Sequence, residues 1–225
     1  MHKISLFSHN WLALLINNRQ VARHLPAMTG AVYDLGCGKR PYEADILRHA
    51  SRYVGVDWSN SLHGQQTDVT ANLNEPLPIA DAAADTVVSF QVLEHLSQPQ
   101  TMLAETRRIL KPGGTLLLAV LFQWAVHEAP WDFYRYTQYG LTHQLSQAGF
   151  SDIRVEAVSG FLPPWVLKLN YQTLRLVRGP KPVQWLIKLL LLPLWLPNQT
   201  TALLLDPLWR GEEETMGYFV TARKP

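Results

Sequence analysis

Val32-Tyr33-Asp34-Leu35-Gly36-Cys37-Gly38 is the most informative segment of this 225-residue chain. Its first four residues predict a short buried strand, and its glycines predict a turn in which a ligand can approach the backbone. Glycines also mark ordinary turns, so the next segment, Tyr53-Val54-Gly55-Val56-Asp57, carries much of the evidence. This β-branched run ends in an acidic residue about 20 positions further on, the spacing at which an open α/β sheet presents a carboxylate to a ribose.

Strand and helix patterns alternate along most of the chain. We expect strands at residues 31–35, 52–57, 67–70, 85–90, 115–121, 152–158 and 216–222. Helices are expected at residues 5–25, 42–50, 99–110 and 140–148, the last with Gly149 as its C-terminal cap. This alternation predicts a mainly parallel sheet with right-handed crossovers.

Two further motifs complete a family pattern, Leu93-Glu94-His95-Leu96 and Leu110-Lys111-Pro112-Gly113-Gly114. With them, residues 30–122 resemble class I S-adenosylmethionine-dependent methyltransferases of the type 11 group. The resemblance implies an α/β fold, a Rossmann-like, seven-stranded and mostly parallel sheet with helices on both faces. Its last two strands would be an antiparallel edge pair with a C-terminal hydrophobic helical insert between them. The implied cofactor is S-adenosyl-L-methionine and the implied reaction is methyl transfer.

The resemblance also assigns cofactor-binding residues. Asp34 and the turn Gly36 to Gly38 would surround the methionine part, with Cys37 as a small apolar filler in that turn. The other implied contacts are Asp57 at the ribose, Asp68 and Val69 at the adenine, and Gln91 at the reactive end, with Trp58 as a further cofactor-binding residue. Asp57 could instead be a strand-end cap, and Asp68 an exposed turn residue. Arg40 stands near the position where the family often has a third glycine, so it must point away or contact the cofactor carboxylate.

A loop rich in polar and aromatic residues, 127–137, follows the fifth expected strand. Catalytic residues concentrate outside the carboxyl ends of parallel strands, so the loop is expected to line a substrate pocket. A similar segment occurs in type 11 methyltransferases linked with surface polysaccharides. His127 is our candidate general base, because imidazole titrates near neutral pH, although a structural histidine is the alternative. The expected substrate-binding residues are His95, Trp131, Asp132, Tyr134, Arg135 and Tyr136. Asp132 and Arg135 could instead pair with each other and pin the loop, and the aromatic residues could be ordinary core.

Residues 160–212 have an unusual composition. From Ala157 to Leu205 there is no Asp or Glu, whereas the basic residues there recur at helical spacing: Lys168, Arg175, Arg178, Lys181 and Lys188. Amphipathic helices on an anionic membrane surface have this composition, and a lid or a dimer face are the alternatives. We therefore expect three parts: an N-terminal helical segment (1–29), a cofactor-binding domain (30–159 and 213–225) and a hydrophobic basic insert (160–212).

Composition also limits the partners and the cellular location that we expect for this protein. A formal net charge of +2 is too small to indicate a nucleic-acid partner. The single cysteine, Cys37, excludes an internal disulfide and fits a reducing compartment. The apolar run Trp11 to Ile16 is too short for a membrane span and is followed by no cleavage pattern. We expect a cytoplasmic enzyme, peripheral on the inner membrane face, with a homodimer left open.

The expected substrate is a small or amphiphilic acceptor, first a lipid-linked sugar hydroxyl and second a quinone or lipid. No metal site is predicted, because the histidines show none of the paired spacings of zinc ligands. A nicotinamide-dependent oxidoreductase would need a small residue where Pro41 stands, and it would not explain Leu110 to Gly114. A binding subunit that retains the fold without activity is the other alternative.

Overall fold

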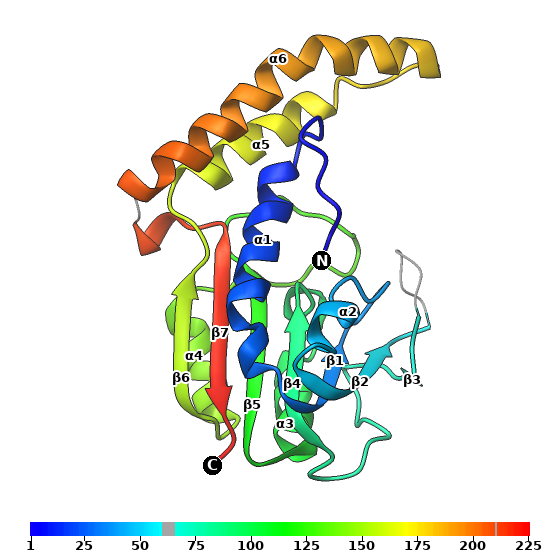
Figure 1. The fold of residues 1–225 in the computed structure, drawn as a ribbon, viewed down its shortest axis with the longest axis vertical. Helices are drawn as coiled ribbons and strands as arrows, with labels where there is room; N and C mark the ends of the chain where they lie inside the picture. The colour runs from blue at the N-terminus through cyan, green and yellow to red at the C-terminus, as the bar shows by residue number, and fades with distance from the viewer. Residues whose placement is uncertain (60–65, 210) are drawn as a thin grey trace.

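The computed structural model describes residues 1–59, 66–209 and 211–225, and it contains a seven-stranded mixed sheet (Figure 1). The strands are β1 (Gly30–Leu35), β2 (Ala50–Asp57), β3 (Val69–Thr70), β4 (Ala84–Phe90), β5 (Leu110–Leu121), β6 (Ser151–Ala157) and β7 (Gly217–Arg223). Their order is β3-β2-β1-β4-β5-β7-β6, with β7 antiparallel to both neighbours. The expected fold class is confirmed. The parallel strands all end at the same edge, which is where a ligand site belongs in an open α/β sheet.

The sheet is covered on both faces because its central strands are apolar on both sides. One core packs Leu35 and Val56 against α3 (Pro99–Ile109) and α4 (Gln138–Gln147). The other packs Val32 and Val88 against α1 (Trp11–His24) and α2 (Glu43–Ile46). In Figure 1, α1 crosses in front of the sheet, and α3 and α4 lie behind it.

Helix ends follow local signals in two places. α3 begins at Pro99, where the missing N–H has no intrahelical partner to lose. α4 is followed by Gly149 at φ +83°, and the Phe150 N–H bonds the Leu145 carbonyl at 3.1 Å. Gly149 therefore forms the expected C-terminal cap.

Two helices are shorter than the sequence predicts. The helix expected at 42–50 ends at Ile46, because β2 begins early, with Ala50 paired to Gly30 in β1. The helix expected at 5–25 begins only at Trp11. The preceding segment folds back along α1, where His2 and Asn18 exchange two hydrogen bonds of 2.9 and 3.1 Å.

Residues 160–212 contain two long helices, α5 (Leu162–Leu174) and α6 (Lys181–Leu205), which pack together as a hairpin above the sheet edge (Figure 1). Its base is held by buried polar groups. The Gln199 side chain accepts a hydrogen bond from the Leu12 N–H at 2.9 Å and donates to the Ser8 carbonyl at 3.1 Å. Buried Asp206 accepts from the Gly160 N–H at 2.9 Å. The base is thus fixed to the start of α1 and to the end of β6.

The hairpin tip, residues 174–192, extends beyond the rest of the molecule (Figure 1). Its apolar side chains are largely exposed, with Trp185 at 66% and Leu190 at 70%. No helix within the described ranges has both the length and the apolar character that crossing a membrane requires.

Candidate functional site

A cavity of about 510 Å³ opens at the carboxyl ends of β1, β2 and β4. It has the size of a site for a nucleoside-containing small molecule. Gly36, Asp57 and Gln91, one from the end of each of these strands, line it. None of the described lining residues comes from 160–212, so nothing in the cavity supports the reading of this insert as its lid.

The turn after β1 requires glycine at its first position. Gly36 has φ +83°, and a Cβ there would lie 2.3 Å from Cγ2 of Val92. The Gly38 N–H donates to Oδ2 of Asp57 at 2.8 Å, and the Trp58 N–H donates to Oδ1 at 2.8 Å. The Asp57 carboxylate is therefore held in one orientation beside the turn. The ends of β1 and β2 share one crevice, as the sequence predicts.

Asp34 lies at the inner end of the same cavity and is almost completely buried. Tyr53 donates a hydrogen bond to its Oδ2 at 2.5 Å. Burial raises the pKa of Asp34 to about 7, although the Tyr53 hydrogen bond acts in the opposite direction. An adjacent cationic group would favour ionisation of Asp34, so the site fits a ligand with an ammonium or sulfonium centre.

Gln91, at the end of β4, has a strained backbone. Its φ is +59°, its N–H bonds the Ala119 carbonyl at 2.8 Å, and its buried side-chain oxygen has no partner. Such strain persists where the surroundings impose it, which is common at binding sites. Gln91 thus offers an amide acceptor at the cavity wall.

Two predicted cofactor residues, Asp68 and Val69, are not among the described residues that line the cavity. Asp68 pairs instead with Arg40 at 2.7 Å and accepts the Gly55 N–H at 2.8 Å. Arg40 itself is not among the described residues that line the cavity, and its guanidinium carbon lies 5.6 Å from the centroid of the Tyr53 ring. Asn72 and Asn74 line this side of the cavity instead.

Asp132 and Arg135 pair with each other, which was the alternative left open by the sequence. Two nearly parallel contacts of 2.6 and 2.7 Å join them, and Asp132 also accepts the His127 N–H at 2.8 Å. Burial opposes ionisation of Asp132, but the hydrogen bonds from Arg135 and the His127 amide outweigh it and lower the pKa to about 2. Arg135 further donates to the Ala125 carbonyl at 2.9 Å, so this pair braces the loop.

The aromatic residues of the loop divide into three environments. Trp131 lines the cavity and meets Trp58 edge to face, with ring centroids 5.3 Å apart. Tyr136 is buried and donates to the Leu93 carbonyl at 3.0 Å. Tyr134 is 40% exposed and does not line the cavity. Only Trp131 of the three is placed to contact a ligand there.

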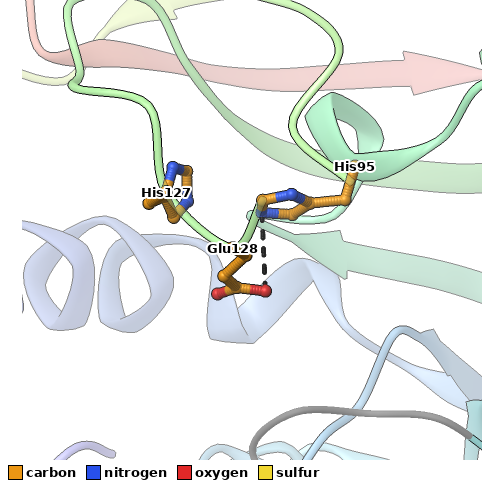
Figure 2. Close-up of side chains that lie close together, drawn as sticks. All are labelled: His95, His127 and Glu128. Carbon is orange, nitrogen blue, oxygen red and sulfur yellow. Dashed lines mark ion pairs between the residues drawn. The ribbon is translucent and has the colours of Figure 1, made fainter. Parts of the chain in front are cut away.

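Three side chains, which we call the His-His-Glu cluster, lie close together: His95, His127 and Glu128 (Figure 2). His95 lies in the 3₁₀ turn after β4, and the other two lie in the loop after β5. The two imidazole centroids are 4.8 Å apart, and Nε2 of His95 is 4.0 Å from a Glu128 oxygen. His95 and Glu128 line the cavity, whereas His127 is not among the described lining residues. Burial and the neighbouring His95 lower the pKa of His127.

Glu94 is fully buried beside this cluster, and neither of its carboxylate oxygens has a hydrogen-bond partner. Burial raises its pKa to about 8. Its backbone carbonyl accepts N–H groups from Phe133 and Tyr134 at 2.9 and 3.2 Å. The turn after β4 is therefore tied directly to the loop after β5.

One wall of the cavity was not predicted from the sequence. His2, Asn17 and Gln20 line it, from α1 and the segment before it. The apolar spacing of α1 predicts a helix, but only its packing against the sheet places these polar residues. Asn72 was also missed, because it belongs to no recognisable motif, and Glu128 was not singled out within the loop 127–137.

Comparison with known proteins supports the resemblance. A family model described as a methyltransferase domain matches residues 33–118. A protein of Mycolicibacterium smegmatis, named a probable S-adenosylmethionine-dependent methyltransferase, is 34% identical over 39% of this chain and 37% of its own length. A ubiquinone biosynthesis O-methyltransferase of Cereibacter sphaeroides is 28% identical over 51% of this chain and 53% of its own length. The chain thus spans about half or less of these relatives.

Solved structures confirm the fold. A methyltransferase from Archaeoglobus fulgidus, described as SAM-dependent, aligns with a TM-score of 0.60 at 16% identity, over 95% of this chain and 94% of its own. The [4+2]-cyclase SpnF aligns with a TM-score of 0.59 at 21% identity, over 96% of this chain and 83% of its own. At such identities the likeness shows the fold alone. The cyclase also shows that one fold can carry different chemistry.

Proposed function

We propose that the protein transfers a methyl group from S-adenosylmethionine to a hydroxyl of a small or amphiphilic acceptor, since residues 33–118 match the model of a methyltransferase domain and the relatives are named as methyltransferases. The observation that carries the proposal is the crevice in which Gly38 and Asp57 are hydrogen-bonded at 2.8 Å. A fixed carboxylate beside a glycine turn suits a ribose diol and a neighbouring amino-acid moiety. When bound, the cofactor supplies an electrophilic methyl group on a sulfonium.

The chain's own residues would orient the two reactants and exclude water. We assign the ribose contact to Asp57, and the contacts near the reacting methyl to Asp34, Gln91 and Trp58. Handling of the acceptor proton is assigned to the His-His-Glu cluster, because it borders the cavity. His95 is nearer the cavity than His127, so the base predicted at His127 acts together with its neighbour.

We propose that the hairpin tip binds the protein to an anionic membrane surface, and that the acceptor is located at this surface. Between Ala157 and Leu205 the chain is free of acidic residues, and the tip exposes basic residues beside Trp185 and Leu190. Each basic residue near such a surface contributes roughly 1 kcal/mol of attraction, to which apolar burial adds. A lipid-linked sugar hydroxyl is the first candidate acceptor. A quinone-type phenol is the second, and the relative named for ubiquinone biosynthesis favours it.

The test is transfer of a labelled methyl group from the cofactor to fractionated cell envelope. We expect the label in the lipid extract. Release by mild acid together with a sugar would identify the first acceptor, and retention in an apolar ring compound the second. A protein that binds S-adenosylhomocysteine in calorimetry but labels no fraction would support the inactive binding subunit instead.

The membrane part has its own test. The protein is mixed with vesicles containing anionic phospholipid, and with neutral vesicles, and both samples are floated at low and high salt. We expect flotation with anionic vesicles at low salt only. A protein that stays in the soluble fraction at low salt lacks this surface contact, and a dimer face would then explain the exposed tip.

A further inference from the structure

The His-His-Glu cluster has the composition of a metal site. One ligand atom from each of His95, His127 and Glu128 lies within 4.8 Å of the others. Among the described residues, these three form the group of His, Cys, Asp or Glu side chains whose ligand atoms lie close enough together to hold a metal ion. They come from two segments that are far apart in sequence, and Figure 2 shows the three side chains close together.

The contacts around the cluster orient the imidazoles as ligands. Nδ1 of His95 lies 2.6 Å from the Trp131 carbonyl, which can only accept, so this nitrogen carries the proton. The Nε2 of His95 is then an acceptor, and it faces Glu128 at 4.0 Å. Metal-binding histidines usually donate their second ring N–H to a carbonyl or carboxylate in this way.

His127 has a corresponding outer partner. Its Nδ1 lies 3.4 Å from Oδ2 of Asp132, and Arg135 holds that carboxylate in place with contacts of 2.6 and 2.7 Å. The Arg135 guanidinium lies 3.5 Å from the same Nδ1, so this nitrogen has a donor as well as an acceptor beside it. When the proton lies on Nδ1 and faces Asp132, Nε2 of His127 is left for an ion.

We propose that His95, His127 and Glu128 bind a divalent transition-metal ion, Zn²⁺ in the first instance, at the acceptor end of the cavity. Two imidazoles and one carboxylate suit zinc or another transition metal rather than magnesium. Ligands about 2.1 Å from a tetrahedral ion are about 3.4 Å apart, so ligand atoms that lie within 4.8 Å of one another must approach by up to about 1.4 Å. Three protein ligands leave a position open for a substrate oxygen.

This inference rests on the proposed function and specifies how the acceptor is activated. A hydroxyl oxygen bound to the ion loses its proton to water more readily, because the metal stabilises the oxyanion. That oxygen then forms a bond to the methyl carbon, the S–CH₃ bond breaks, and its electron pair remains on sulfur. The products are the methyl ether, S-adenosylhomocysteine and a released proton. In this arrangement the histidine nitrogens act as metal ligands, which replaces the role of general base assigned to them in the proposed function.

The test begins with ZnCl₂ titrated calorimetrically into the full chain after treatment with a chelator. We expect one site, and affinity reduced more than tenfold in His127→Ala and in Glu128→Gln. His49→Ala, an exposed histidine outside the cluster, is the matched control and should bind as the wild type does. CoCl₂ gives a second readout, a visible absorption band that the two cluster variants lose. Equal binding by wild type and variants, or no binding by any, overturns the inference.

Cofactor binding separates this inference from the proposed function. Retained binding of S-adenosylhomocysteine by His127→Ala and Glu128→Gln shows that the variants are folded. If the wild-type protein binds the cofactor but not Zn²⁺, the metal site is wrong and the proposed function stands. If it binds Zn²⁺ but no cofactor, the proposed function fails and the site remains. Full methyl transfer by the metal-free protein overturns the catalytic role of the ion.

Discussion

At the ends of β1 and β2, polar groups are partnered by short hydrogen bonds, as between Gly38 and Asp57 at 2.8 Å. At the hairpin tip the reverse holds, because apolar side chains such as Trp185 are exposed to solvent at 66%. The polar groups of the first region are already partnered before any ligand binds. The apolar side chains of the second region are not covered by other described residues of the chain. The difference indicates two kinds of recognition, one of a small polar molecule and one of an extended surface.

The largest effect is expected from Asp57→Ala. The variant removes an acceptor held by two backbone N–H groups, each at 2.8 Å. Hydrogen bonds to a charged group contribute roughly 1.5–3 kcal/mol each, so the loss of two ribose contacts should weaken S-adenosylhomocysteine binding at least about 100-fold. Calorimetry measures this. Asp68→Ala is the matched control, and a larger loss there than in Asp57→Ala would reverse our assignment of the cavity.

Asp132→Asn tests whether the pair of Asp132 and Arg135 stabilises the loop after β5. It leaves Arg135 without its carboxylate, which predicts a loss of about 3 kcal/mol in the free energy of unfolding, measured in urea. The pKa of Asp132 is lowered to about 2, so its contribution is present above its unfolded pKa and is lost as pH falls toward 2. The difference between variant and wild type should therefore shrink in acid. A difference that is constant with pH would contradict the pairing.

Glu94→Gln tests the buried carboxyl behind the cluster. Its pKa is raised to about 8, so the folded state holds a proton that the unfolded chain releases at lower pH. Stability due to this group is complete at low pH and falls by about 1.4 kcal/mol per pH unit until pH reaches the folded pKa. Melting temperatures of the glutamine variant and the wild type should agree near pH 5 and diverge in favour of the variant toward pH 8. Parallel curves would show that Glu94 is ionised.

The smallest effect concerns the tip. Replacing Lys181 and Lys188 by Glu should weaken binding to anionic vesicles more than about tenfold, since each basic residue contributes about 1 kcal/mol. Flotation at low salt measures this. Arg154→Glu, an exposed basic residue on β6, is the control. Cofactor binding should be unchanged in the Lys181 and Lys188 variant and in Arg154→Glu. A loss of cofactor affinity in the Lys181 and Lys188 variant would mean that the hairpin tip and the cavity are not independent.

The parts of the molecule that depend on local patterns could be predicted from the sequence. Gly36 and Asp57 belong to adjacent parallel strands, so their spacing alone places them in one crevice. Contacts that depend on how distant elements pack together could not be predicted from the sequence. Asp68 pairs with Arg40 instead of lining the cavity, and Gln20 reaches the cavity only because α1 lies across the sheet.

The His-His-Glu cluster shows the same limit. His95 and His127 come from different turns, and the three-dimensional approach of β4 and β5 brings them together. The paired spacings that reveal zinc sites in sequences are absent, so the prediction of no metal followed from the pattern alone. The roles of the individual site residues stay predictions, while the fold and the family resemblance are confirmed.

The position of β7 has a consequence for how the chain folds. It lies between β5 and β6, yet it follows β6 only after the whole hairpin, from Ala157 to Gly217. β6 therefore has no neighbour in the sheet until a distant segment arrives, and closing so long a loop carries an entropic cost before any pairing rewards it. We expect the parallel half and the hairpin to form early, and insertion of β7 to limit the folding rate.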